Sequence, residues 1–135
     1  MKIVLDTNVL VAGLLTPFNA PGEIVRMTSG GVLQLCHDAR ILSEYASVLH
    51  RSKFNFNSDH VDALLEQIRE RGHQVSGVPL EKPLPDSDDE SFLEAAIAGE
   101  AACLVTGNLK HYPHGDRQGI LVLSPSDFLT FYRKR

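Results

Sequence analysis

The stretch Ile3-Val4-Leu5-Asp6-Thr7-Asn8 decides how we interpret the rest of the chain, because it joins an apolar run directly to a carboxylate. A continuous run of β-branched and aliphatic residues is typical of a strand buried in a parallel sheet, and ligands of such α/β sheets bind outside the carboxyl ends of the strands. Asp6 stands at that end. An Asp in this position can also simply cap the following helix, so the other acidic residues must decide between the two interpretations.

The bulk composition is that of an ordinary globular protein. The 135 residues suit one domain, which we place at residues 1–135, and they are 43% hydrophobic and 22% charged. No run approaches the roughly 18 apolar residues that a membrane span needs, and Asp6 interrupts the first apolar run too early for a signal peptide. We therefore expect a cytoplasmic protein without a membrane contact.

Charge and cysteine content restrict the function only loosely. The formal net charge of −4 is not the footprint of a typical nucleic-acid binder, but it does not exclude one that has a local basic patch. Cys36 and Cys103 both lie in apolar runs, which predicts buried thiols rather than a disulfide or a zinc site.

Strand and helix signals alternate along the chain. Apolar runs predict strands at residues 3–5, 32–36, 101–106 and 120–123, with a short extended piece at 73–78. Helical periodicity, capping residues and Gly or Pro breaks predict helices that begin near residues 9, 19, 38, 58, 90 and 124. This alternation predicts an α/β fold, a three-layer α/β/α sandwich with a mostly parallel central sheet.

Glu44 is an acid on an otherwise apolar helix face. It lies three residues after Ile41 and four before Val48, which places its side chain on the apolar stripe. Burying an unpaired carboxylate is costly, so Glu44 needs a cation, a metal or a protein donor. The alternative is that Glu44 lies at the border of the stripe and reaches solvent.

The segment Asp86-Ser87-Asp88-Asp89-Glu90 places four acids before a predicted helix. Capping and the helix dipole explain one or two of them. An acid that points back toward the sheet edge can meet Asp6 and form the oxygen ligand set that Mg²⁺ or Mn²⁺ favours. Such ions activate water and stabilise charge on the attacking and leaving oxygens of a phosphodiester. His111 and His114 could be taken for a metal pair, but two histidines across a Pro in a loop do not have the spacing of a zinc site.

Together these segments resemble the PIN-domain family, in particular its VapC-like branch of toxins from toxin–antitoxin systems. Four segments carry the resemblance: residues 3–8, residues 41–45 with Arg51-Ser52-Lys53-Phe54 behind them, residues 85–96, and Leu104-Val105-Thr106-Gly107-Asn108. The resemblance implies a PIN-like fold and a metal-dependent endoribonuclease that hydrolyses RNA phosphodiester bonds with Mg²⁺ or Mn²⁺. It also implies a small antitoxin protein as partner, and we expect a homodimer.

The resemblance places the catalytic and metal-binding acids at Asp6, Glu44 and Asp89, with Asp88 in support. Asp89 is preferred over Asp88 because Phe92 then falls three residues later, and a small residue seven later, as in the family's helix. Many relatives carry an Asp at the position of Asn108. An amide oxygen can still bind a hard cation, but the missing charge predicts one tightly bound ion rather than two.

The remaining expected roles concern orientation and substrate. Asn8, Thr7 and Thr106 are expected to orient the ligands around the metal. Four basic residues are expected to contact RNA on the basis of charge alone: Arg40, Arg51, Lys53 and Lys110.

Two other functions stay open at this point. A phosphatase of the haloacid-dehalogenase type would use Asp6 as nucleophile, but Asn8 stands where that chemistry needs a second carboxylate as general acid. The second alternative is a catalytically weak or inactive PIN fold that binds RNA or a protein, and Asn108 is its best support.

Overall fold

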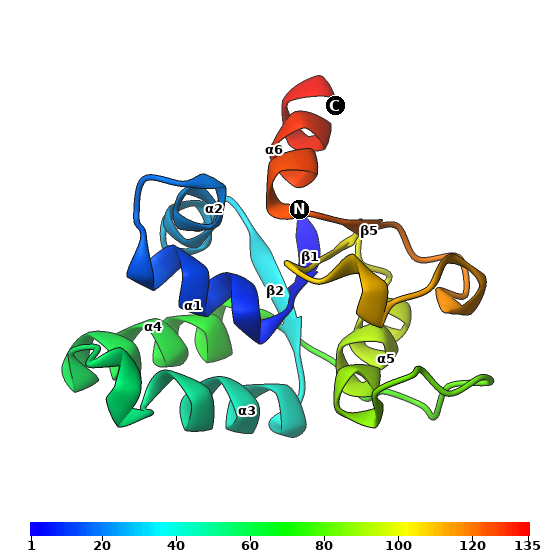
Figure 1. Cartoon of the computed structure of the whole chain (residues 1–135), viewed down its shortest axis with the longest axis horizontal. Helices are drawn as coiled ribbons and strands as arrows, with labels where there is room; N and C mark the ends of the chain where they lie inside the picture. Colours follow the sequence, from blue (N-terminus) through cyan, green and yellow to red (C-terminus); the bar gives the residue numbers. More distant parts are fainter.

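The centre of the fold is a sheet of five parallel strands in the order β3-β2-β1-β4-β5 (Figure 1). The computed structural model describes residues 1–135. The strands are β1 Lys2–Leu5, β2 Gln34–His37, β3 His73–Gln74, β4 Leu104–Val105 and β5 Val122–Leu123. The predicted α/β class with a mostly parallel sheet is therefore confirmed, and every strand pair is parallel. The first strand of the chain lies in the middle of the sheet.

Helices cover the sheet on both sides. They are α1 Thr7–Leu15, α2 Ala20–Ser29, α3 Ala39–Leu49, α4 Ser58–Arg71, α5 Glu90–Ala98 and α6 Pro125–Lys134, with short 3-10 turns η1 Ser52–Phe54, η2 Ser87–Asp89, η3 Leu109–His111 and η4 His114–Asp116. Helices α1–α4 lie to one side of β1 and β2, and α5 lies to the other (Figure 1). This arrangement places the strand ends between α1, α3 and the start of α5.

The predicted helix starts are set by local side-chain caps. Asn19 accepts a hydrogen bond of 2.9 Å from the Gly22 amide at the start of α2, and Asp38 accepts one of 3.0 Å from the Ile41 amide at the start of α3. Such caps satisfy amides that have no partner within the helix. Helix α1 begins at Thr7, two residues before the predicted start, so β1 passes into α1 with only Asp6 between them.

The strands are shorter than the apolar runs predicted. Val32 and Leu33 fall outside β2 because their amides donate to the carbonyl of Met27 at the end of α2. On the other side of β1, pairing extends beyond the two residues of β4, since the Val4 amide donates to Cys103 and the Asp6 amide donates to Val105. The predicted apolar segments are thus present, but only their central residues form regular ladders.

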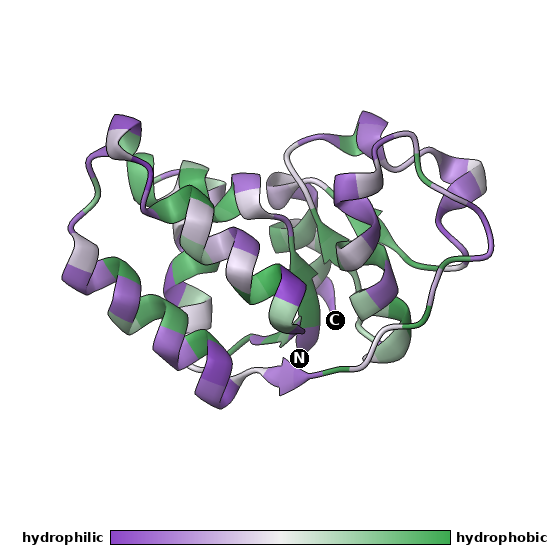
Figure 2. Ribbon diagram, turned by 90° about the horizontal axis from the view of Figure 1, so that it is seen from below, coloured by the Kyte–Doolittle hydropathy of each residue, from purple (hydrophilic) through white to green (hydrophobic).

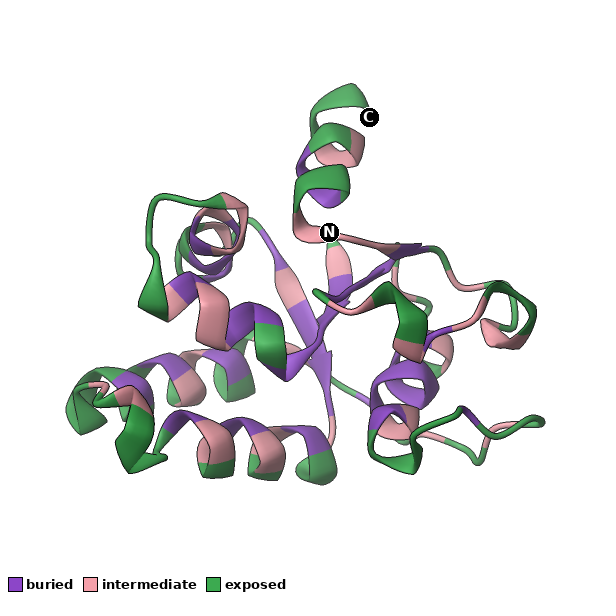
Figure 3. Ribbon diagram, in the orientation of Figure 1, coloured by how far each residue is buried: buried purple, intermediate pink, exposed green.

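The strands and the inner faces of the helices form the core. Figure 2 shows hydrophobic residues along most of the sheet and Figure 3 shows these segments largely buried, whereas the edge strand β3 is polar and partly exposed. Cys36 and Cys103 are buried free thiols, as predicted, and burial raises the pKa of Cys103 to about 12. None of the helices has the length and apolar character needed to cross a membrane.

Candidate metal centre

Asp6 lies at the carboxyl end of the central strand and is not used as a helix cap. It occupies the residue before α1, but its side chain makes no capping hydrogen bond. Instead, Oδ2 accepts a hydrogen bond of 2.8 Å from the Thr106 hydroxyl and one of 3.3 Å from the Tyr112 hydroxyl. Burial raises the pKa of Asp6, and these hydrogen bonds act in the opposite direction. The carboxylate is therefore held by donors from the far end of the chain.

Glu44 lies on α3 and reaches the same region. It is half-buried, and it accepts a hydrogen bond from the hydroxyl of Thr7, the residue after Asp6. Glu44 therefore has a protein hydrogen-bond donor, one of the three partners expected for an acid on an apolar helix face. Thr7 links Glu44 to the end of β1.

The acidic segment before α5 divides into different roles. Asp86 caps η2 by accepting from the Asp88 amide at 2.9 Å, and Glu90 accepts from the Leu84 amide at 2.9 Å. Asp88 is exposed and lines a pocket of about 260 Å³ together with Glu44. Asp89 alone is buried, and it makes no capping bond to α5. Its carboxylate therefore has no local structural role.

The negative charge of Asp89 is only partly compensated, by His111. Burial, and next the charge of Asp6, raise the pKa of Asp89 to about 6, while His111 lowers it. Oδ2 of Asp89 lies 2.9 Å from Nδ1 of His111, but the approach is not aligned for a hydrogen bond and this buried oxygen has no hydrogen-bond donor. A buried carboxylate oxygen without a donor is costly. This environment favours a bound cation.

His111 and Tyr112 are residues of this centre that the sequence analysis did not assign to it. Tyr112 is fully buried, and its pKa is raised by burial and by the charges of Asp6, Asp89 and Glu44. These three acids come from separate segments of the chain, and Asp6 is the one that the Tyr112 hydroxyl contacts directly. No periodicity marks this loop, so the signals in the sequence are its position directly after the strand that ends at the predicted site and the two histidines His111 and His114, whose spacing is not that of a zinc site.

Asn108 and Asn8 hold the turn that follows β4. The Asn108 amide donates a hydrogen bond of 3.0 Å to the Thr106 hydroxyl, and its side-chain Nδ2 lies 2.7 Å from Nε2 of His111. Asn8 accepts a hydrogen bond of 3.0 Å from the amide of Gly107. Asn8 therefore orients the turn between Thr106 and Asn108, and it makes no hydrogen bond to Asp6.

The four basic residues expected at the RNA have different surroundings. Arg40 forms ion pairs of 2.8 Å with Asp38 and 2.9 Å with Glu94. Arg51 and Lys53 lie beyond the end of α3, and the Lys53 ammonium stands 5.1 Å from the centre of the Phe54 ring. Lys110 is exposed on η3, next to His111, and forms no ion pair. Arg40 lines the pocket that contains Glu44 and Asp88, but its charge is already paired, whereas Lys110 precedes His111 in the chain and has no ion pair.

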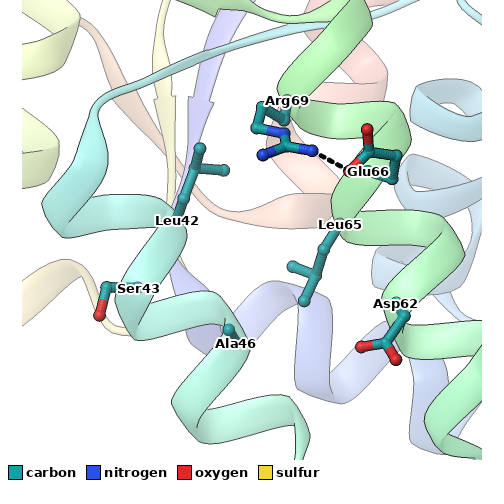
Figure 4. A pocket seen from close by; sticks show the side chains of 7 residues that line it. All are labelled: Leu42, Ser43, Ala46, Asp62, Leu65, Glu66 and Arg69. Atoms are coloured by element: carbon teal, nitrogen blue, oxygen red, sulfur yellow. Dashed lines mark hydrogen bonds and ion pairs between the residues drawn. The ribbon is translucent and has the colours of Figure 1, made fainter.

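A separate groove between α3 and α4 holds no such chemistry. It has a volume of about 430 Å³ and is lined by residues that include Leu42, Leu65 and Arg69 (Figure 4). Its charged groups are paired, because Arg69 contacts Glu66 and Asp62 lies 2.9 Å from His50. We therefore assign no catalytic role to this groove.

The donor set at the acidic centre fits a divalent cation. Carboxylate oxygens of Asp86 and Asp89 and a ring nitrogen of His111 lie within 4.8 Å of one another. Asp6 adds a further carboxylate at the adjacent strand end, and its charge acts on Asp89. Carboxylate oxygens with an imidazole suit divalent ions such as Mg²⁺, Mn²⁺ or heavier transition metals.

The protein is an α/β protein with a parallel sheet, and buried carboxylates lie near the end of its central strand. Acidic groups placed in this way are typical of proteins that bind a divalent ion there. The chain matches the PIN domain family model over residues 2–110, and it belongs to the PIN-domain family. Members of this family are generally metal-dependent nucleases. No curated protein matches the chain. The family match ends at Lys110, so His111 and Tyr112 lie just outside it.

Proposed function

We propose that this chain is a metal-dependent endoribonuclease that hydrolyses RNA phosphodiester bonds with Mg²⁺ or Mn²⁺ held by Asp6, Glu44 and Asp89. The observation that carries the proposal is the Asp89 carboxylate. It is buried, Asp6 raises its pKa, and Oδ2 has no hydrogen-bond donor. A divalent ion would supply the positive charge that this arrangement lacks.

When bound, such an ion would activate water and stabilise negative charge on the phosphate oxygens. The chain's own residues hold the carboxylates in place for it. Thr106 and Tyr112 hold Asp6, and Thr7 holds Glu44. The raised pKa of Tyr112 keeps its hydroxyl protonated at neutral pH, so it remains a donor. Lys110, exposed beside His111, is the basic residue best placed to meet an RNA phosphate.

Cleavage of RNA is the direct test. The purified protein with Mn²⁺ and a mixture of RNAs is expected to cleave RNA, and Asp6→Asn is expected to abolish the cleavage. Asp59→Asn is a matched control, since Asp59 is an exposed acid in the first turn of α4. Equal cleavage by the Asp6→Asn protein would remove Asp6 from the mechanism.

We extend the proposal to a toxin of a toxin–antitoxin pair with a small antitoxin protein and a homodimeric state. Membership of the PIN-domain family supports it. Phe18, which is 93% exposed, and Leu15, which is 54% exposed, offer apolar surface for a protein partner. The test is expression of the wild type, which is expected to arrest growth, and co-expression of any short neighbouring gene for a DNA-binding fold with a disordered tail, which is expected to restore it.

A second function, binding of RNA or a protein without cleavage, is favoured by Asn108. This residue supplies no charge to the acidic centre and its Nδ2 faces His111. Calorimetric titration separates the two functions. If neither Mg²⁺ nor Mn²⁺ binds up to millimolar concentration, with or without RNA, the binding module is the better description.

A further inference from the structure

His111 stands between two groups that fix its ring. Its Nδ1 lies 2.9 Å from Oδ2 of Asp89, and its Nε2 lies 2.7 Å from Nδ2 of Asn108. Nε2 accepts with the Asn108 amide in this orientation and donates when the amide is turned over, so this contact is compatible with either ring tautomer. The imidazole is thus held at the edge of the acidic centre, with its Nδ1 side directed at Asp89.

The same corner contains the buried oxygen that has no donor. Asp86, Asp89 and His111 bring their ligand atoms within 4.8 Å of one another. Asp89 Oδ2 is buried in this group without a hydrogen-bond partner. The distance of 2.9 Å between this oxygen and Nδ1 is close to the separation of adjacent ligands in an octahedral site, which is about 3 Å when each bond is about 2.1 Å.

We propose that His111 is a nitrogen ligand of the divalent ion that Asp89 holds, and that it makes the site prefer Mn²⁺ over Mg²⁺. This inference rests on the proposed metal-dependent function. Mn²⁺ and Mg²⁺ both bind carboxylate, carbonyl and water oxygens, but Mn²⁺ is a first-row transition ion and accepts an imidazole nitrogen more readily than Mg²⁺ does, with the heavier transition ions binding it more tightly still. An acidic centre of carboxylates alone would separate the two ions much less.

Asn108 is then the positioning residue for this ligand. Nδ1 can offer a lone pair to a metal only when the ring proton is on Nε2, and Nε2 then needs an acceptor. A half-turn of the Asn108 side-chain amide replaces Nδ2 by Oδ1 and supplies that acceptor at the same place. The amide that seemed a lost acidic ligand in the sequence therefore supports the imidazole, as outer partners of metal-bound histidines do.

Metal titration of the full-length protein tests this proposal. Calorimetry with MnCl₂ and with MgCl₂ is carried out on the wild type, His111→Ala and His111→Gln, with His114→Ala as control. His114 is an exposed histidine three residues away, outside the ligand group. We expect the Mn²⁺ Kd to rise by about 10-fold or more in both His111 variants and the Mg²⁺ Kd by less than about threefold. The His114→Ala protein should bind both ions as the wild type does.

Pulsed electron paramagnetic resonance of the Mn²⁺-loaded protein provides a second readout. A ¹⁴N coupling from a directly bound imidazole is expected in the wild type and in His114→Ala, and it should be absent from both His111 variants. Mn²⁺ binding without a ¹⁴N coupling, or an equal loss of both metals on substitution, overturns the role of His111 but leaves the nuclease proposal standing. Failure of the wild type to bind either ion overturns both.

Discussion

The Thr106 hydroxyl donates a hydrogen bond of 2.8 Å to Oδ2 of Asp6, across one hundred residues of chain. It joins the end of β4 to the end of β1, one position beyond the last paired residues of the two strands, Leu5 and Val105. The bond therefore depends on the parallel register of the sheet. It is also the largest hydrogen-bond contribution that opposes the effect of burial on the pKa of Asp6.

Thr106→Val should weaken both the fold and the metal site. The substitution keeps the shape of the side chain but removes the shorter of the two hydroxyl bonds to Asp6 and the acceptor of the Asn108 amide. We expect the free energy of unfolding to fall by about 1.5–3 kcal/mol, the range for a hydrogen bond to a charged group, measured by urea unfolding. Thr130→Val is the control, because its hydroxyl bonds within the exposed surface of α6. An equal effect of the two substitutions would show that the Asp6 bond has no special weight.

Asp89→Asn should stabilise the metal-free protein at neutral pH. Burial and Asp6 raise the pKa of Asp89 to about 6 in the folded state, against 3.8 as its ordinary value. The folded protein thus binds more protons than the unfolded one between these values, and the wild type loses stability as the pH rises through about 6. At pH 7 we expect the free energy of unfolding of Asp89→Asn to exceed that of the wild type by on the order of 2 kcal/mol. The difference should vanish near pH 4.

The comparison is made by urea unfolding from pH 4 to pH 8 in the presence of a chelator. Asp88→Asn, which neutralises the exposed acid one residue earlier, should give a much smaller difference. A destabilised Asp89→Asn protein at pH 7 would contradict an only partly compensated charge at this position. With Mn²⁺ at 100 times its Kd the order should reverse, because binding adds about 2.7 kcal/mol to the wild type alone.

Lys110→Ala should weaken RNA binding, whereas Arg40→Ala should mainly lower the stability of the fold. Lys110 is exposed without an ion pair, so its loss should weaken RNA binding and reduce the slope of log K against log salt by about 0.7. Arg40 bonds to Asp38 and to the buried Glu94, so Arg40→Ala should mainly lower stability, by about 1–3 kcal/mol. Fluorescence anisotropy with a labelled RNA in an Asp6→Asn background measures the first effect, and urea unfolding measures the second. Equal RNA affinities for wild type and Lys110→Ala would place the RNA elsewhere.

His37 should make the fold sensitive to mild acid. It is buried at the end of β2, neither ring nitrogen has a hydrogen-bond partner, and burial lowers its pKa. The unfolded chain therefore binds the proton more readily, and stability is lost as the pH falls below about 6.5. His37→Leu should remove this contribution, seen as a stability difference between the two proteins that changes with pH between 7 and 5. A constant difference over that range would exclude His37 as the source.

Asp6, Glu44 and Asp89 could be singled out from the sequence because each acid lies where the local pattern gives it no other role, but of the three only Asp89 belongs to the group whose ligand atoms lie within 4.8 Å of one another. A carboxylate after a buried run and a glutamate on an apolar stripe are visible without a structure. The division of labour between Asp86 and Asp89 was not visible, since a single 3-10 turn decides which of them caps and which is buried. The assignment of Asp6, Glu44, Asp88, Asp89 and Asn108 as metal ligands remains a prediction.

The contacts of His111 and Tyr112 with the acidic centre could not be predicted from the sequence. Neither lies on a periodic element, and their meaning comes from contacts with Asp89 and Asp6 that only the folded chain creates. The same holds for Asn108, whose amide was interpreted by its charge alone although its neighbour His111 explains its presence. Sequence patterns identify residues that lack a local structural role, whereas contacts between residues of different loops can be seen only in the folded structure.

The central position of β1 has a consequence for the order in which the protein is made. Asp6 leaves the ribosome first, but the strand that completes its surroundings is β4, and the donors Thr106 and Tyr112 follow it. A nascent chain that carries all three acids still lacks the parts that hold the first of them. The acidic centre is therefore assembled only late in synthesis, and a chain terminated before β4 lacks the hydroxyl groups that hold Asp6.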